Sequence, residues 1–247
     1  MASFKGGRSS SYLQHDNGAS FYIREMLLEP PLDAVVSECL DAVANHCPRS
    51  FTKEVAYVFV QCDYDLFLNG LSELSEEDAK HLSEHHGDLH LGGLESLISL
   101  PLAAKLAKSH QSALHLNGVR QMSAGVAGIL AEFRGATLHL NGLQQLPADT
   151  AQALAAFKGE CLFLCGITEM SPEAASALAK FPGAFLYLDR LRALTSHSAA
   201  ELARYQGERL HLSGVVQLSP DIADALAQYT GSQLCCERRS KSAARGG

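Results

Sequence analysis

Hydrophobic and polar residues recur along residues 66–233 in a unit of about 24 residues. Each unit opens with a leucine, and a partial eighth unit begins at Leu234; the leading leucines are Leu66, Leu89, Leu114, Leu138, Leu162, Leu186 and Leu210. Counted from this leucine as repeat position 1, position 3 is again leucine in all seven units, and positions 6 and 9 are aliphatic or methionine. Such regularity predicts stacked, near-identical structural units.

Two different periods lie within each unit. Positions 1 to 4 alternate apolar and variable residues, which is typical of a strand. Apolar residues at positions 14, 17 and 20 or 21 share one face of a helix. A hydroxyl residue that can cap this helix precedes it at Ser75, Ser123, Ser171, Thr195 and Ser219. Glycine at position 22 predicts a left-handed turn after the helix, and glycine at position 5 predicts a positive φ.

Neither element is stable within its own unit. A helix of about ten residues is marginal alone in water, and a lone strand has no pairing partner. Stacking resolves both problems, because Leu138–Asn141 can pair in parallel with Leu162–Cys165 while the leucines point inward against the helices.

Two irregularities interrupt the pattern. The unit at Leu89 has a one-residue insertion around "LISLPLAA", and Arg190 replaces the position 5 glycine, which predicts a local kink or simple repeat decay.

The segment "LHLNGLQQL" and its copies resemble the leucine-rich repeat family, over about residues 66–236. The resemblance implies an α/β solenoid with a parallel β-sheet on the concave face, helices on the convex face, and a protein partner. The chain departs from the family at one place. The family's usual Asn or Cys, three residues after the second strand leucine, is replaced by Leu143, Ile167, Leu191 or Val215. A buried asparagine ladder is therefore not expected.

The flanks divide the chain into further regions. Residues 1–20 are rich in glycine and serine and are predicted to be disordered, and a short helix is expected from Phe21 to Leu28. Residues 21–65 are predicted to cap the first repeat, with a small docking domain as the alternative. Residues 66–236 form the repeat region of seven full units and a partial eighth strand. Residues 237–247 form a basic flexible tail, which is expected to be solvated or to anchor an acidic partner.

Composition narrows the function. The formal net charge is −7, so nucleic acid is not an expected ligand. The chain contains no run of 18 apolar residues and no signal-like apolar N-terminus, which predicts neither a membrane span nor secretion. Its seven cysteines are odd in number and form no CxxC pair, so reduced thiols and a cytoplasmic location are expected.

The variable strand positions are where a function has to lie. Position 2 reads Phe67, His90, His115, His139, Phe163, Tyr187 and His211. We predict a non-enzymatic protein-interaction module without a cofactor, whose partner contacts His115, His139, Phe163 and Tyr187, with polar contacts from Asn141, Cys165 and Asp189. The alternative is that these residues have no binding role and are β-forming side chains half covered by their neighbours.

The same positions carry two chemical alternatives. The row of His90, His115 and His139 has the ligand atoms for zinc, although a straight row does not converge on one ion as a tetrahedral site requires. Cys165 with Asp189 and His139 contains the groups of a nucleophilic site, but strand geometry keeps His139 at a diagonal. His81 and His85 stand one helical turn apart, and His85 aligns with Phe133 at a packed position. The partner's identity, the biological process and the oligomeric state remain open.

Overall fold

The computed structural model describes residues 3–7, 10–14, 20–23, 66–86, 89–215 and 218–236. Within the repeats a short strand and a short helix alternate seven times, followed by a last strand. In chain order these elements are β4 (Leu66–Phe67), α3 (Glu76–Ser83), β5 (Leu89–His90), α4 (Leu100–Ala107), β6 (Ala113–His115), α5 (Ala124–Leu130), β7 (Thr137–His139), α6 (Ala148–Leu154), β8 (Cys161–Phe163), α7 (Pro172–Leu178), β9 (Phe185–Tyr187), α8 (Ser196–Leu202), β10 (Arg209–His211), α9 (Pro220–Leu226) and β11 (Gln233–Cys235).

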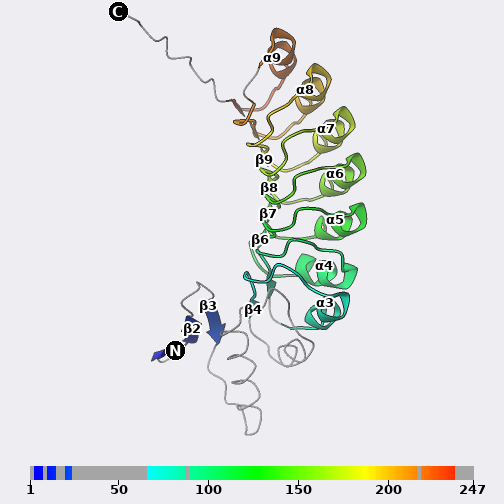
Figure 1. Ribbon diagram of the computed structural model, residues 1–247. Coiled ribbons are helices and arrows are strands. Elements are labelled where there is room, and N and C mark those ends of the chain that lie inside the picture. Colours follow the sequence, from blue (N-terminus) through cyan, green and yellow to red (C-terminus); the bar gives the residue numbers. More distant parts are fainter. Residues whose placement is uncertain are drawn as a thin grey trace, which may run out of the picture.

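The strands pair in parallel, each with the strand of the next repeat. β6 to β11 form one six-stranded open sheet, and β4 and β5 form a separate pair. The register aligns the leading leucines, so that Leu138 lies opposite Leu162 as the repeat spacing predicted. Figure 1 shows the repeats as a curved stack with the strands on the inner side and the helices α3 to α9 on the outer side. We call the strand side the concave face.

The core lies between the strand layer and the helix layer. The leading leucine and the position 3 leucine of each full repeat from Leu89 onward are at most 1% exposed, as for Leu138 and Leu140. The position 14 alanines pack against them, and Ala127, Ala151, Ala175 and Ala199 are fully buried. The predicted inward and outward phasing is thus confirmed for these residues. Stacking makes the core continuous, because every repeat covers the apolar faces of both its neighbours.

The helices begin at the predicted caps. The hydroxyls of Ser75, Ser123, Ser171, Thr195 and Ser219 each accept a hydrogen bond from the backbone N–H three residues on. Pro172 and Pro220 occupy the first helical turn, where no N–H partner is needed. Each helix has only seven or eight residues, shorter than the expected ten. Tertiary packing therefore stabilises them more than helix propensity does.

The position 22 glycines have another cause than the predicted left-handed turn. The helices end in ordinary right-handed backbone, and the described position 22 glycines have no left-handed φ. A Cβ on Gly159 would lie 2.2 Å from Cζ of Phe157 and 2.7 Å from the carbonyl oxygens of Gly135 and Ala136. Glycine is required here because the position 20 ring folds over it and the preceding repeat lies directly against it.

The repeat at Leu89 provides an internal comparison for the position 22 glycines. Its insertion shifts the later positions by one, so that Ser109 aligns with the ring position and Gln111 with the glycine position. The five repeats from Leu114 to Leu210 pair an aromatic ring at position 20 with glycine at position 22. Gly87 of the first repeat lies outside the described residues. In the second repeat, where the position 20 ring is absent, the glycine position accommodates the side chain of Gln111.

The position 5 glycines also serve close packing. A Cβ on Gly142 would lie 2.3 Å from the carbonyl oxygen of Asn117 in the preceding repeat. No left-handed φ occurs at Gly93, Gly118, Gly142, Gly166 or Gly214. The predicted positive φ is therefore wrong. Of the two alternatives given for Arg190, a local kink or repeat decay, the kink is not seen. Leu191 N–H still donates to the carbonyl of Leu188 at 3.1 Å, as the equivalent pairs do in other repeats.

The inserted residue of the second repeat is Ile98. It precedes the cap Ser99, and 73% of its surface is exposed. The sheet is interrupted after this repeat's strand, between β5 and β6. At the same place Gly92 occupies position 4, where neighbouring repeats carry an asparagine that accepts from the next repeat. The loss of that side-chain acceptor coincides with the loss of strand pairing.

The N-terminal flank contains strands where disorder and a helix were predicted. β1 (Ser3–Gly7), β2 (Ser10–Gln14) and β3 (Ser20–Ile23) form an antiparallel sheet. Tyr12 lies opposite Tyr22, and Phe4 opposite Leu13. The β-forming aromatic residues among the glycines and serines explain the strands, since such residues favour a pleated conformation. Residues 24–65, the remainder of the predicted cap, and the basic tail at 237–247 lie outside the described residues.

Candidate functional site

Five aromatic and imidazole rings stack face to face along the concave face. The ring centroids of His115 and His139 are 4.3 Å apart, and those of His139 and Phe163 are also 4.3 Å apart. Phe163 and Tyr187 follow at 4.1 Å, and Tyr187 and His211 at 4.2 Å. The planes of neighbouring rings differ by only 6° to 22°. We call this row of five side chains the ring ladder.

The parallel register of the sheet produces the ring ladder. Position 2 of each strand pairs with position 2 of the next, so His139 lies opposite Phe163 and Phe163 opposite Tyr187. Backbone strands are about 4.8 Å apart, so planar side chains at one register position meet at stacking distance. Because each inner ring has a ring on both of its faces, the ladder presents mainly ring edges to solvent. His115 is exposed, and the other four rings are partly buried.

A second row of side chains holds the ends of the strands together. At position 4 the Asn117 Oδ1 accepts from the N–H of Asn141 at 3.3 Å and from its Nδ2 at 3.0 Å. Asn141 Oδ1 accepts in turn from the N–H of Cys165 at 3.0 Å, and Asp189 Oδ1 from that of Ser213 at 3.4 Å. The side chains thus continue the strand hydrogen bonding for one more residue. These asparagines are half-buried or exposed beside the ring ladder, as the alternation predicted.

The structure therefore places the seven predicted site residues in two adjacent rows. His115, His139, Phe163 and Tyr187 are consecutive members of the ring ladder. Asn141, Cys165 and Asp189 are consecutive members of the position 4 row, where their side chains already bond between repeats. The side-chain oxygens of Asn141 and Asp189 can still accept further hydrogen bonds through their second lone pairs.

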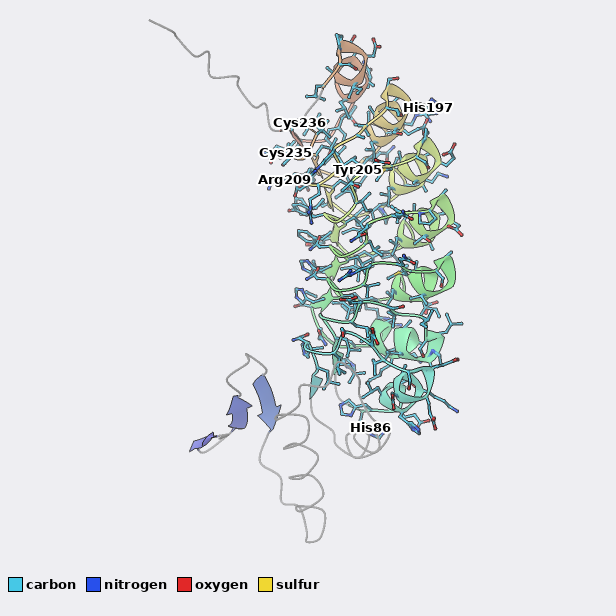
Figure 2. All side chains as sticks on the ribbon, in the orientation of Figure 1. His86, His197, Tyr205, Arg209, Cys235 and Cys236 are labelled. Carbon is cyan, nitrogen blue, oxygen red and sulfur yellow. The ribbon has the colours of Figure 1, made fainter. Side chains whose placement is uncertain are left out.

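Sequence reasoning left out three residues that extend this surface. His211 belongs to the ring ladder, and its position 2 register was the available signal. Phe185 and Arg209 directly precede the leading leucines and face the same side as position 2. The Arg209 guanidinium carbon lies 5.5 Å from the centroid of the Phe185 ring, a cation–π distance. Figure 2 shows Arg209 with Cys235 and Cys236 on the strand side, and His197 on the helix side.

Burial affects the protonation of the ring ladder. Desolvation by burial, and then the neighbouring imidazole of His115, lower the pKa of His139 below its ordinary value. His139 is therefore neutral at neutral pH, and stacking on a neutral ring is not opposed by its charge. Burial likewise raises the pKa of Tyr187, with a further contribution from the Cys161 thiol, so its hydroxyl stays protonated.

The geometry gives no support to a metal site in the histidine row. The lone pair of an imidazole nitrogen lies in the ring plane, and the planes of His115 and His139 are within 15° of parallel. Parallel rings direct their lone pairs side by side rather than toward one ion. Across the described ranges, no group of three or more His, Cys, Asp or Glu side chains could hold a metal. His85 is 2% exposed, in agreement with the predicted packed position.

The cysteine at position 4 lacks the surroundings of an activated nucleophile. Cys165 Sγ donates toward Asp189 Oδ2 at 3.8 Å, so the thiol has a carboxylate neighbour rather than a general base imidazole. Burial raises the pKa of Cys165, and the charge of Asp189 also raises it. A thiol with a raised pKa contains little thiolate at neutral pH and is a poor nucleophile. Cys235 Sγ and His211 Nε2 are 4.0 Å apart, which is long for proton transfer.

None of the helices in the described ranges has the length and apolar character needed to cross a membrane. A comparison of the chain with models of known protein families finds no matching family. A search of curated proteins finds no significant match either.

Proposed function

We propose that this protein is a non-enzymatic interaction module of leucine-rich-repeat type, whose protein partner binds across the ring ladder. The repeat unit and its alternation of strand and helix support the repeat type. The observation that carries the function is the uninterrupted stack of five rings over five consecutive repeats. Large aromatic side chains on the inner face of a curved sheet are typical anchors for a protein partner.

The ring ladder is already ordered before binding. Each inner ring is held between two others at 4.1–4.3 Å, so its rotamer is restricted in the free protein. A partner then loses less affinity to the ordering of these side chains than it would on a mobile surface. The same register that stabilises the sheet thus prepares the surface for association.

The exposed ring edges restrict the chemistry of the partner. Aromatic rings carry partial negative charge on their faces and partial positive charge at their edges. Because the faces of Phe163 and Tyr187 are covered, their edges favour electron-rich groups such as carbonyl oxygens or the face of a partner's aromatic ring. Asn141, Cys165 and Asp189 lie alongside and supply the polar contacts through their remaining lone pairs.

The test requires a partner isolated by affinity capture on the intact protein and then purified. The double change Phe163→Ala with Tyr187→Ala should weaken its affinity at least about thirtyfold, because central aromatic anchors typically contribute 2 kcal/mol or more when truncated. The matched control is Gln152→Ala with Lys180→Ala, two exposed residues of the helix side. Loss of binding in the control but not in the ring variant would place the partner on the other face.

A further inference from the structure

A hollow with a positively charged border lies away from the ring ladder, at the C-terminal ends of α4, α5 and α6. Its volume is about 1210 Å³. The charged and titratable residues that line it are Lys108, His110, Glu132, Arg134 and Lys158. Three fixed positive charges against one negative charge contrast with the overall charge of −7. We propose that this hollow binds an acidic segment of a protein in extended conformation.

The hollow exists because the second repeat lacks its position 20 ring. Ser109 stands where later repeats carry Phe133, Phe157 or another ring, and Ser109, Gln111 and Phe133 all line the hollow. Gly128 opens it on the outer side, because a Cβ there would meet nothing within 4 Å. The missing ring volume and the missing side chain on the helix thus leave space at one point of an otherwise regular stack.

The lining contains donors without acceptors. Gln111 Nε2 is buried and has no hydrogen-bond partner among the described residues. The side chains of Arg134, Lys158 and Lys108 are exposed and form no ion pair or hydrogen bond within the described part of the chain. A buried amide donor without a partner and three exposed cations around one hollow are complementary to carboxylate oxygens.

The spacing of neighbouring repeats fits alternate residues of an extended chain. Arg134 and Lys158 follow Phe133 and Phe157, whose ring centroids are 6.3 Å apart in neighbouring repeats. Every second side chain of an extended peptide recurs after roughly 6.6–6.8 Å on one side of the strand. Acidic residues at alternate positions would therefore meet successive repeats. A long nucleic acid is disfavoured, since it would extend beyond the hollow over a negatively charged protein.

The probe is a short, fluorescently labelled peptide of alternating serine and glutamate, titrated with the intact protein and followed by anisotropy. A peptide of the same composition with its glutamates in one block is the ligand control. We expect the alternating peptide to bind at least about threefold more tightly, and binding to fall as salt is raised to about 0.5 M, because exposed charges are screened. Equal binding of the two peptides would overturn the proposal.

Two pairs of variants locate the site. Arg134→Gln with Lys158→Gln should reduce the affinity about tenfold, whereas Lys180→Gln with Arg192→Gln removes the same charge elsewhere and should change it less than about twofold. Gly128→Phe fills the hollow without changing charge and should also weaken binding. Gln152→Phe places the same ring at the corresponding position of the next helix and should not. Equal effects within either pair would contradict the site.

Two further measurements distinguish the hollow from the concave face and a peptide ligand from a nucleic acid. The double change Phe163→Ala with Tyr187→Ala should leave the peptide's affinity unchanged, because the ring ladder lies on the other face. If that variant alone abolishes peptide binding, the acidic segment binds the concave face and the hollow is not its site. If an oligothymidylate of equal charge binds more tightly than the alternating peptide, the ligand is a nucleic acid and the proposal fails.

Discussion

Gly159→Ala tests whether ring packing, rather than backbone conformation, requires glycine at position 22 of the repeats that carry a ring at position 20. The added methyl group would lie 2.2 Å from Cζ of Phe157 and 2.7 Å from two backbone carbonyl oxygens. Ordinary contact begins near 3.4 Å, so the ring must move by more than 1 Å or the repeats must separate. The ring is fully buried and lies between two others at 6.3 and 6.1 Å, so no free space receives it.

The magnitude follows from these contacts. Overpacking of this kind costs about 1–3 kcal/mol. The smaller conformational entropy of alanine in the unfolded chain offsets about 0.4–1 kcal/mol where the backbone tolerates it. We therefore expect a net loss of about 1–2 kcal/mol, which lowers the melting temperature by roughly 2–8 °C for a chain of this size.

Urea denaturation monitored by circular dichroism measures the loss, with Gly128→Ala as the matched control. A Cβ at Gly128 meets nothing within 4 Å, and the residue lies inside α5. That substitution should stabilise the protein by about 0.5–1 kcal/mol, because alanine is the better helix former. A second check introduces Gly159→Ala into the variant Phe157→Ser. Gly159→Ala should destabilise this variant less than the unchanged protein, because the ring is absent. Equal penalties with and without the ring would refute the role of ring packing.

Three further predictions concern the concave face. Leu140→Ala removes a fully buried side chain and should destabilise by about 2–5 kcal/mol, whereas His139→Ala, one residue away and facing outward, should lose far less in the same thermal melt. Because the pKa of His139 is lowered in the folded state, the unfolded chain takes up its proton first as the pH falls. The free energy of unfolding should thus have its full value above about pH 6.5 and decrease below it. His139→Phe should remove this part of the pH dependence in urea titrations. Chelator treatment or added zinc should leave the melting temperature unchanged; stoichiometric zinc that is lost on His115→Ala would instead establish the metal alternative.

The sequence alone determined the repeat, its period and the side of each strand that faces the core. Leu138 and Leu140 had to be inside, because a period of two and a period near 3.6 within one unit leave only one arrangement that buries both apolar faces. The hydroxyl caps could also be predicted, since their hydrogen bonds are local. The row of His115, His139, Phe163 and Tyr187 followed from register, because equal spacing places the same position of each repeat side by side.

Contacts between repeats were decided only by the tertiary structure. Glycine signals either a left-handed backbone or a close approach, and only the distances from Gly142 and Gly159 to the preceding repeat separate the two. The role of Asn141 and Asp189 as acceptors for the next repeat's amides depends on where the strand hydrogen bonding ends. The hollow beside Gln111 depends on which side chain is missing among neighbours 24 residues away, and a pattern within one unit carries no information about such distances.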